Sequence, residues 1–238
     1  LAAAAMAGVL IEILIIRRLY RRDHLDQVLA TFALILLLSE GVRWSFGAFP
    51  LYLNIPNSLG GSVLLPFEII YSKYRMFIIL VGISIAIGLY FLISKTRLGI
   101  RIRAGQNDRQ MISALGVDIS KLYTIVFAIG AALAGLAGAM IGAIQSVEVG
   151  MGEPILILAF VVIVIGGIGS IKGAFIGSIL VGVTDTIGRV FLPNLLKIFM
   201  DTSNATSMGS SIGSMLIYIL MALILIIKPS GLFGINEK

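Results

Sequence analysis

The sequence predicts an all-α, polytopic membrane protein, and three observations support this fold class. Hydrophobic residues make up 58% of the 238 residues, the mean hydropathy is +1.06 and only 13% of the residues are charged, whereas soluble domains carry about 25% charged residues. Apolar segments recur along the chain, most of them close to the roughly 20 residues that a helix needs to cross a bilayer. The Lys and Arg residues, which give the chain a formal charge of +6, gather at the ends of these segments, as in cytoplasmic loops.

About seven transmembrane segments are expected, in one transmembrane domain over 1–238. The first opens at Leu1 inside an apolar run, so we expect that amino-terminal helices of the native protein are missing. The run 155–165 is short and precedes a glycine-rich stretch; it is either a broken helix that lines a translocation path or a helix that ends in an ordinary tight turn. The expected segments are residues 1–16, 27–46, 76–94, 122–144, 155–165, 174–192 and 212–227.

The connections between these segments set the expected orientation. Residues 17–26 contain four arginines and residues 95–121 contain six arginines and lysines, so we place both loops in the cytoplasm. Residues 47–75 contain prolines and a turn-like Asn-Ser-Leu-Gly-Gly stretch, which predicts an external loop with a short hairpin. The stretch from Pro193 to Gly209 is expected to be a polar, irregular loop.

The cytoplasmic loop 95–121 has the pattern of a short amphipathic helix. Apolar residues recur at roughly helical spacing between Ile102 and Leu115, beside a polar run from Arg103 to Arg109. Gly116 is expected to end this helix, since glycine tolerates the left-handed backbone at helix ends. Asp118 or Ser120 can then cap the next helix, which we expect to begin at Leu122.

Small residues and paired charges occur within the apolar segments. Small residues at four-residue spacing predict close helix packing; they are Ala131/Gly135, Ala134/Gly138, Gly138/Gly142, Gly169/Gly173/Gly177 and Gly209/Gly213. The pairs Glu40/Arg43 and Asp185/Arg189 can each share a helical face. They are either interfacial ion pairs or parts of a proton or ion relay. Glu12 is expected to pair with Arg17 or Arg18 at the inner surface.

Catalysis by this chain is not expected. There is no cysteine, a single histidine, no G-x-S-x-G elbow and no phosphate-binding G-x-x-x-x-G-K-[ST] loop. No metal site and no cofactor are therefore predicted, and any nucleotide-driven step must occur on another subunit.

Several blocks resemble the permease subunits of branched-chain amino acid ABC transporters, a family type that also includes urea and short-amide permeases. The blocks are RRLYRRDHLDQVLATF (17–32), RAGQNDRQMISALGVDISKLY (103–123), FAIGAALAGLAGA (127–139), GGIGSIKGAFIGSILVG (166–182) and KPSGLFG (228–234). They follow the family's order across nearly the whole chain. The family's first helices, with an Asn-Phe-Ala-His-like region, have no counterpart here.

The resemblance implies a permease of the bacterial inner (plasma) membrane, with membrane lipid around it and no nucleic acid. The implied partners are two ABC ATPase subunits, a homologous or identical second permease subunit and an external solute-binding protein. The implied solutes are branched-chain amino acids or similar small molecules, with urea or short amides as the alternative. The short cytoplasmic helix would couple to the ATPase through Arg103, Gln106, Asn107, Asp108, Arg109, Ala114 and Gly116.

Two readings from other classes remain open at this level. A proton-coupled secondary carrier would use Glu40, Arg43, Asp185 and Arg189, and a membrane-structural or channel role would not depend on the 96–123 loop. For the glycine-rich break, the candidate residues of a translocation path are Gly166, Gly167 and Gly169.

Overall fold

The computed structural model describes residues 1–20, 22–65, 69–198 and 200–234, and the chain divides into two compact units. Unit 1 comprises Leu1–Gly152 and unit 2 comprises Glu153–Lys238. Each unit is described by itself. The elements of unit 1 are α1 (Ala2–Ile11), the π-helix η1 (Glu12–Ile16), α2 (Arg17–Leu19), α3 (His24–Phe46), β1 (Ser62–Leu65), β2 (Ile69–Ser72), α4 (Lys73–Lys95), α5 (Arg97–Asn107), α6 (Arg109–Ala114) and α7 (Ile119–Gly142).

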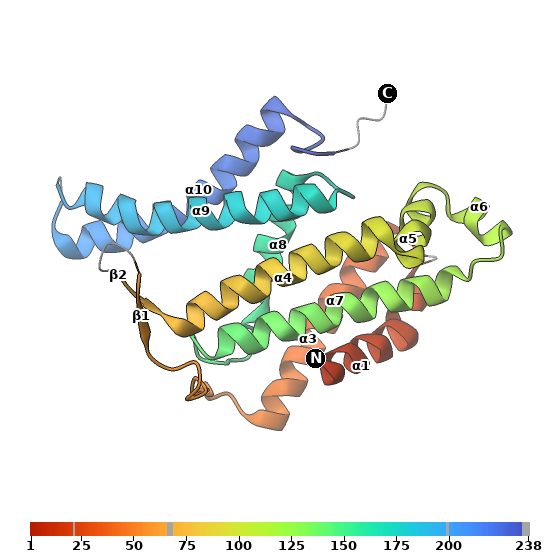
Figure 1. Ribbon diagram of the computed structural model, residues 1–238, viewed down its shortest axis with the longest axis horizontal. Helices are drawn as coiled ribbons and strands as arrows, with labels where there is room; N and C mark the ends of the chain where they lie inside the picture. Colours follow the sequence, from red (N-terminus) through yellow and green to blue (C-terminus); the bar gives the residue numbers. More distant parts are fainter. Residues whose placement is uncertain (21, 66–68, 199, 235–238) are drawn as a thin grey trace. The chain divides into compact units, whose positions relative to one another are not determined.

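In unit 1, α1 runs beside α7 (Figure 1) because small residues line both helices. A Cβ added at Gly8 would collide with the Cβ of Ala131, and one added at Gly135 would collide with the Cβ of Ala4. The close approach predicted for Ala131 and Gly135 is therefore confirmed, and it lets dispersion contacts form along the helix pair where lipid provides no hydrophobic drive.

The segment before α4 contains the short hairpin that the sequence predicts. Strands β1 and β2 pair in antiparallel fashion, from Ser62 opposite Ser72 to Leu65 opposite Ile69. At the same end of unit 1, the hydroxyl of Tyr74, in the first turn of α4, donates a 3.0 Å hydrogen bond to the carbonyl of Met140 in α7. This bond ties the start of α4 to the end of α7.

The helices of unit 2 are α8 (Gly152–Gly166), which enters the unit at Glu153, α9 (Ile171–Leu196) and α10 (Thr202–Ile227). Helices α9 and α10 lie side by side (Figure 1) and are in close contact, with Gly188 against Gly213 and Pro193 against Gly209. The small positions 209 and 213 are thus packing positions, as predicted. The buried core of this unit consists of Val161, Ile165, Val181, Ile217 and Ile224.

The prediction of about seven spans is wrong for the described residues. Five helices are long and apolar enough to cross a membrane, namely α3 from Leu25, α4, α7, α9 and α10. Helix α8 has 15 residues and is about 22 Å long at 1.5 Å per residue, which is short of the roughly 30 Å hydrocarbon core. Helix α1 has ten residues before the helical hydrogen bonding changes at η1.

The polar stretch after residue 200 is helical, so the prediction of an irregular loop up to Gly209 is also wrong. Helix α10 begins at Thr202, ten residues before the expected Ile212. Hydroxyl groups along its first turns donate to the helix's own carbonyls, as Thr206 does to Thr202 at 2.7 Å and Ser211 to Ser207 at 3.0 Å. These bonds satisfy polar side chains within the helix, and the small Gly209 packs against Pro193.

Candidate functional site

The cytoplasmic loop of the sequence prediction is folded, and its first helix is attached firmly to α4. The hydroxyl of Thr96 accepts a 3.2 Å hydrogen bond from the Gly99 amide, which caps α5. A Cβ at Gly99 would collide with the backbone of Ile93, so α5 folds directly back onto the end of α4. Arg103, predicted as a partner contact, donates from its guanidinium to the carbonyl of Ile93.

Asp108 divides the predicted amphipathic helix into two. Its backbone is extended, with φ −146° and ψ 107°, and its carboxylate accepts a 3.0 Å hydrogen bond from the Met111 amide. A carboxylate that bonds an amide three residues on is a typical N-cap. The structure therefore shows α5 and the six-residue α6 where the sequence predicted one short helix.

Helix α6 and the turn that follows it bury one apolar residue and expose two others. Ile112 is 6% exposed, whereas Met111 is 63% and Leu115 is 76% exposed. Met111 and Leu115 are four residues apart, and the Leu115 amide donates to the Met111 carbonyl at 3.1 Å, so both side chains lie on one side of the turn. Gly116 then ends this turn with φ +81°, as predicted.

Asp118 caps α7, which confirms one of the two predicted caps. Its carboxylate accepts a 3.2 Å hydrogen bond from the Lys121 amide and pairs with the Lys121 ammonium at 3.4 Å. The amide bond and then the ammonium group favour the charged carboxylate and lower the pKa of Asp118 below its ordinary value of 3.8. Helix α7 begins at Ile119, three residues before the expected Leu122.

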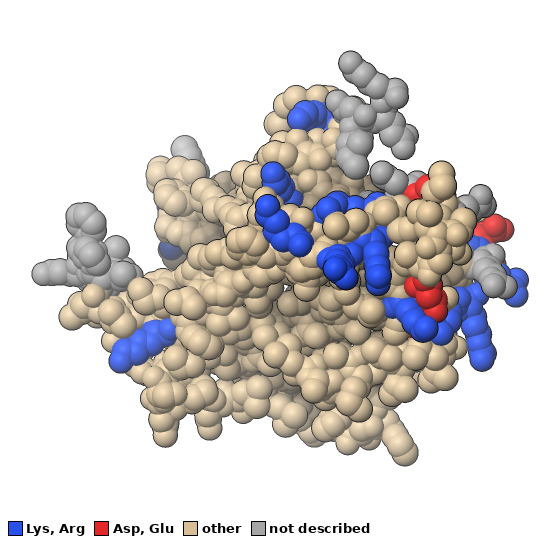
Figure 2. Space-filling model, turned by 45° about the vertical axis from the view of Figure 1, so that its right-hand side comes forward, with Lys and Arg blue, Asp and Glu red and all other residues tan. Residues whose placement is uncertain are grey.

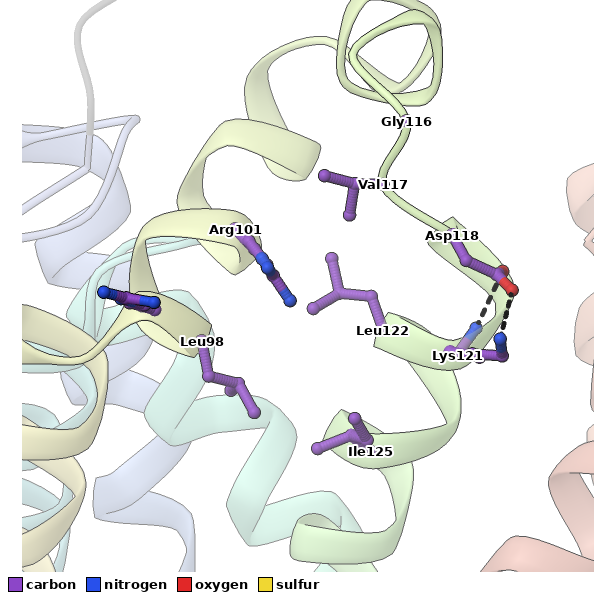
Figure 3. Close-up of a pocket in the computed structure, with 9 residues that line it drawn as sticks. Leu98, Arg101, Gly116, Val117, Asp118, Lys121, Leu122 and Ile125 are labelled. Carbon is purple, nitrogen blue, oxygen red and sulfur yellow. Dashed lines mark hydrogen bonds and ion pairs between the residues drawn. The ribbon is translucent and has the colours of Figure 1, made fainter.

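A groove of about 450 Å³ lies between α5 and the beginning of α7. Leu98, Val117, Leu122 and Ile125 point into it, and Arg101 extends across it toward Leu122 (Figure 3). On the face that Figure 2 shows, Lys and Arg side chains gather with Asp and Glu toward one side, whereas wide areas carry no charge. The groove thus has an apolar interior, and its rim carries Arg97, Arg101 and the paired Lys121 and Asp118.

The structure brings part of the predicted coupling set together on this loop. Arg103 lies on α5, Asp108 between α5 and α6, Ala114 at the end of α6 and Gly116 in the turn after it. The side chains of Gln106, Asn107 and Arg109 lie outside the described part of the chain. The groove is not predicted from the sequence, because Leu122 and Ile125 fall within the expected membrane span 122–144. The available signal was the three-residue spacing of Leu122 and Ile125, which places both on one helical face close to Val117 in the sequence.

The glycine-rich break is a tight turn closed by the carboxyl-terminal tail. Gly167, with φ +96°, is buried. The amide of Leu232 donates to the Ile165 carbonyl at 2.9 Å, and the amide of Phe233 donates to the Gly166 carbonyl at 3.0 Å. The tail thereby satisfies carbonyls that are left open at the end of α8. Gly166, Gly167 and Gly169 lie at this turn, and their role in a translocation path stays a prediction.

The two predicted ion pairs within the spans are present. Arg43 and Glu40 are 2.9 Å apart in α3, and Arg189 and Asp185 are 2.7 Å apart in α9. Each arginine is about half exposed, so the pairs lie at helix surfaces. Glu12 pairs with Arg17 at 3.1 Å, as expected, and is fully buried, which was not expected.

These features define a multi-pass helical membrane protein with a structured loop at one end of α7. The family model described as "branched-chain amino acid transport system / permease component" matches residues 1–225. The chain belongs to this family, and it is a multi-pass protein of the inner (plasma) membrane.

Three relatives indicate how much of a longer permease the chain covers. The probable branched-chain amino acid transport permease protein LivH of Methanocaldococcus jannaschii is 27% identical, over 96% of this chain and 71% of the relative. The high-affinity branched-chain amino acid transport system permease protein BraD of Pseudomonas aeruginosa is 32% identical, over 71% of this chain and 50% of the relative. The corresponding LivH protein of Escherichia coli is 30% identical, over 63% of this chain and 44% of the relative. No solved structure gives a significant match.

Proposed function

We propose that this chain is the transmembrane permease subunit of an ATP-driven ABC importer and passes branched-chain amino acids or similar small solutes across the inner membrane. Family membership over residues 1–225 and the names of the relatives support this assignment. In this proposal residues 1–238 act as a single permease domain, alongside a second permease subunit and an external solute-binding protein.

One observation carries the proposed contact with the ATPase subunits, namely the exposure of Met111 on α6 and of Leu115 directly after it. The many charged side chains of this loop keep it out of the lipid. The two apolar side chains are therefore exposed to water, which is unfavourable. A partner that covers these two side chains would remove them from water. We assign that partner as an ABC ATPase, one for each permease subunit.

The loop is built to pass movement of α6 to the membrane helices. Ile112 anchors α6 by its burial, and the Val117 amide donates to the Ile112 carbonyl at 3.3 Å. The next residue, Asp118, caps α7, so two residues separate the end of the α6 turn from a membrane-spanning helix. Closure of two ATPases on ATP would shift α6 and α7 together and exchange outward-open and inward-open states.

Co-purification tests the ATPase contact. The full-length tagged protein would be extracted from its native membrane in mild detergent, and the retained subunits identified. Met111→Glu and Leu115→Glu place a charge in the proposed contact and are expected to lose a retained ATPase at least 10-fold. Ser113→Glu adds the same charge to an exposed position two residues from each, on the opposite side of the helix, and is expected to retain it.

The same preparation separates the alternatives. If the three variants retain the ATPase equally, α6 is excluded as the contact. If the wild-type protein is recovered without any ATPase from membranes that contain one, the ABC assignment is overturned. Uptake of labelled leucine and of urea into vesicles tests the solute class. Uptake that an uncoupler abolishes while ATP depletion has no effect would instead support a carrier that uses the Glu40–Arg43 and Asp185–Arg189 pairs.

A further inference from the structure

A buried carboxylate joins the first helical segment of unit 1 to α7. Glu12 is 0% exposed. Its Oε2 atom accepts a 2.8 Å hydrogen bond from the Thr124 hydroxyl and lies 3.1 Å from a guanidinium nitrogen of Arg17. The same nitrogen of Arg17 lies 2.7 Å from the Thr124 oxygen, so the three groups form a closed triangle that compensates the buried charge.

The π-helix η1 makes this triangle possible. In an α-helix, side chains three or four residues apart are neighbours, whereas Glu12 and Arg17 are five apart. The π-helical i→i+5 pattern brings them together, and the Arg17 amide also donates to the Glu12 carbonyl. The carboxylate and guanidinium therefore belong to one turn, and Thr124 is the member contributed by another helix.

The contact between the two helices can open without stranding a polar group. The Thr124 hydroxyl has one proton and two acceptors in reach, Glu12 Oε2 at 2.8 Å and the Ser120 carbonyl of its own helix at 2.9 Å. When α7 moves away, the hydroxyl can donate to Ser120, and Glu12 keeps Arg17. Breaking this bond therefore leaves both the Thr124 hydroxyl and the Glu12 carboxylate with a partner.

Thr124 lies where movement of the loop first reaches the membrane helices. It follows the Asp118 cap by six residues, in the second turn of α7. One residue before it, the ring of Tyr123 packs edge-on against Tyr20, which follows α2, with centroids 5.0 Å apart. The contacts of Gly8 with Ala131 continue the pairing along the helices.

We propose that Glu12 is a positioning residue for coupling: through Thr124 it holds the loop end of α7 against η1, so that movement of α6 is passed to α1 as well as to α7. This inference rests on the proposed function. It gives the η1 segment a role in passing movement of α6 to α1. Its position beside a charged loop would not by itself require this role.

Transport stoichiometry tests the role of the bond. The full-length permease, assembled with its ATPase in proteoliposomes, would be assayed for solute uptake and ATP hydrolysis. Thr124→Val keeps the side-chain shape and removes the hydroxyl, and Thr124→Ser keeps the hydroxyl as the matched control. We expect Thr124→Val to lower solute moved per ATP several-fold with ATP hydrolysis and ATPase retention near wild type, and Thr124→Ser to behave as wild type.

A cross-linking measurement detects the contact without any ATPase. Residues 1–238 contain no cysteine, so a Tyr20→Cys/Tyr123→Cys pair and a short bifunctional thiol reagent report the distance between the two segments. The cross-linked fraction is expected to fall several-fold with Thr124→Val and to stay unchanged with Thr124→Ser. A parallel fall with Glu12→Gln is expected, because the neutral amide forms no ion pair with Arg17 and the triangle is weakened.

The outcomes distinguish failure of this inference from failure of the proposed function. If the wild type retains its ATPase but Thr124→Val and Thr124→Ser agree in both stoichiometry and cross-linking, the positioning role of Glu12 is overturned and the permease assignment stands. If the wild type retains no ATPase, the proposed function fails, and the coupling role fails with it.

Discussion

The contact between Gly213 of α10 and Gly188 of α9 allows a quantitative test of the packing in unit 2. A Cβ at position 213 would lie 2.7 Å from the carbonyl carbon of Gly188 and 2.9 Å from the amide nitrogen of Arg189. Both are backbone atoms, which cannot rotate aside as a side chain can. In Gly213→Ala the two helices must separate, and overpacking of this kind costs about 1–3 kcal/mol.

Gly182 provides the matched control on α9. A Cβ added there meets nothing within 4 Å, so Gly182→Ala changes only the backbone preference. Alanine is favoured over glycine inside a helix by about 1 kcal/mol, and this gain is common to both variants. The difference in the free energy of unfolding between Gly182→Ala and Gly213→Ala therefore isolates the packing cost and is expected to be about 1–3 kcal/mol.

The assay is unfolding of the purified protein in mixed micelles with increasing sodium dodecyl sulfate, followed by circular dichroism and fluorescence. Gly213→Ala should unfold at a lower detergent fraction than Gly182→Ala. If the two variants unfold together, α9 and α10 do not touch at Gly213, and the reasoning from backbone contact is refuted.

Three further predictions concern the loop and the tail. Gly116→Val should reduce uptake while the protein still inserts, because φ +81° is strained for a branched residue; Gly116→Asn should retain most of it, and equal uptake in both variants would contradict this reason. Asp118 has a lowered pKa in the folded state, so its contribution to the free energy of unfolding is present above pH 3.8 and is lost as the pH falls further through the folded-state pKa. Unfolding measured against pH should show this loss in the wild type and not in Asp118→Asn. Removal of residues 231–238 should lower the stability of unit 2 by about 1–3 kcal/mol, since it leaves the Ile165 and Gly166 carbonyls without their amide donors; unchanged detergent unfolding would show that the tail does not close this turn.

Local features of the site could be predicted because their causes lie within a few residues. Gly116 at the end of a helix and Asp118 as a cap depend on backbone preference and on an amide three residues away. The Glu40–Arg43 and Asp185–Arg189 pairs depend on helical spacing. The helical start of α10 was missed although its hydroxyl bonds are also local, because a run of Ser, Thr and Asn is equally compatible with a loop until the packing of Gly209 against Pro193 selects the helix.

The sequence by itself determined that the chain is an all-α membrane protein with a charged loop before α7, because hydropathy and charge are summed over neighbouring residues. The tertiary structure decided which apolar residues of that loop are covered. It buries Ile112 and exposes Met111 and Leu115, although all three belong to one apolar stripe in the sequence. It also joined Glu12 to Thr124, 112 residues away, because the partner of a buried charge is set by the packing of α1 against α7, which no local pattern encodes.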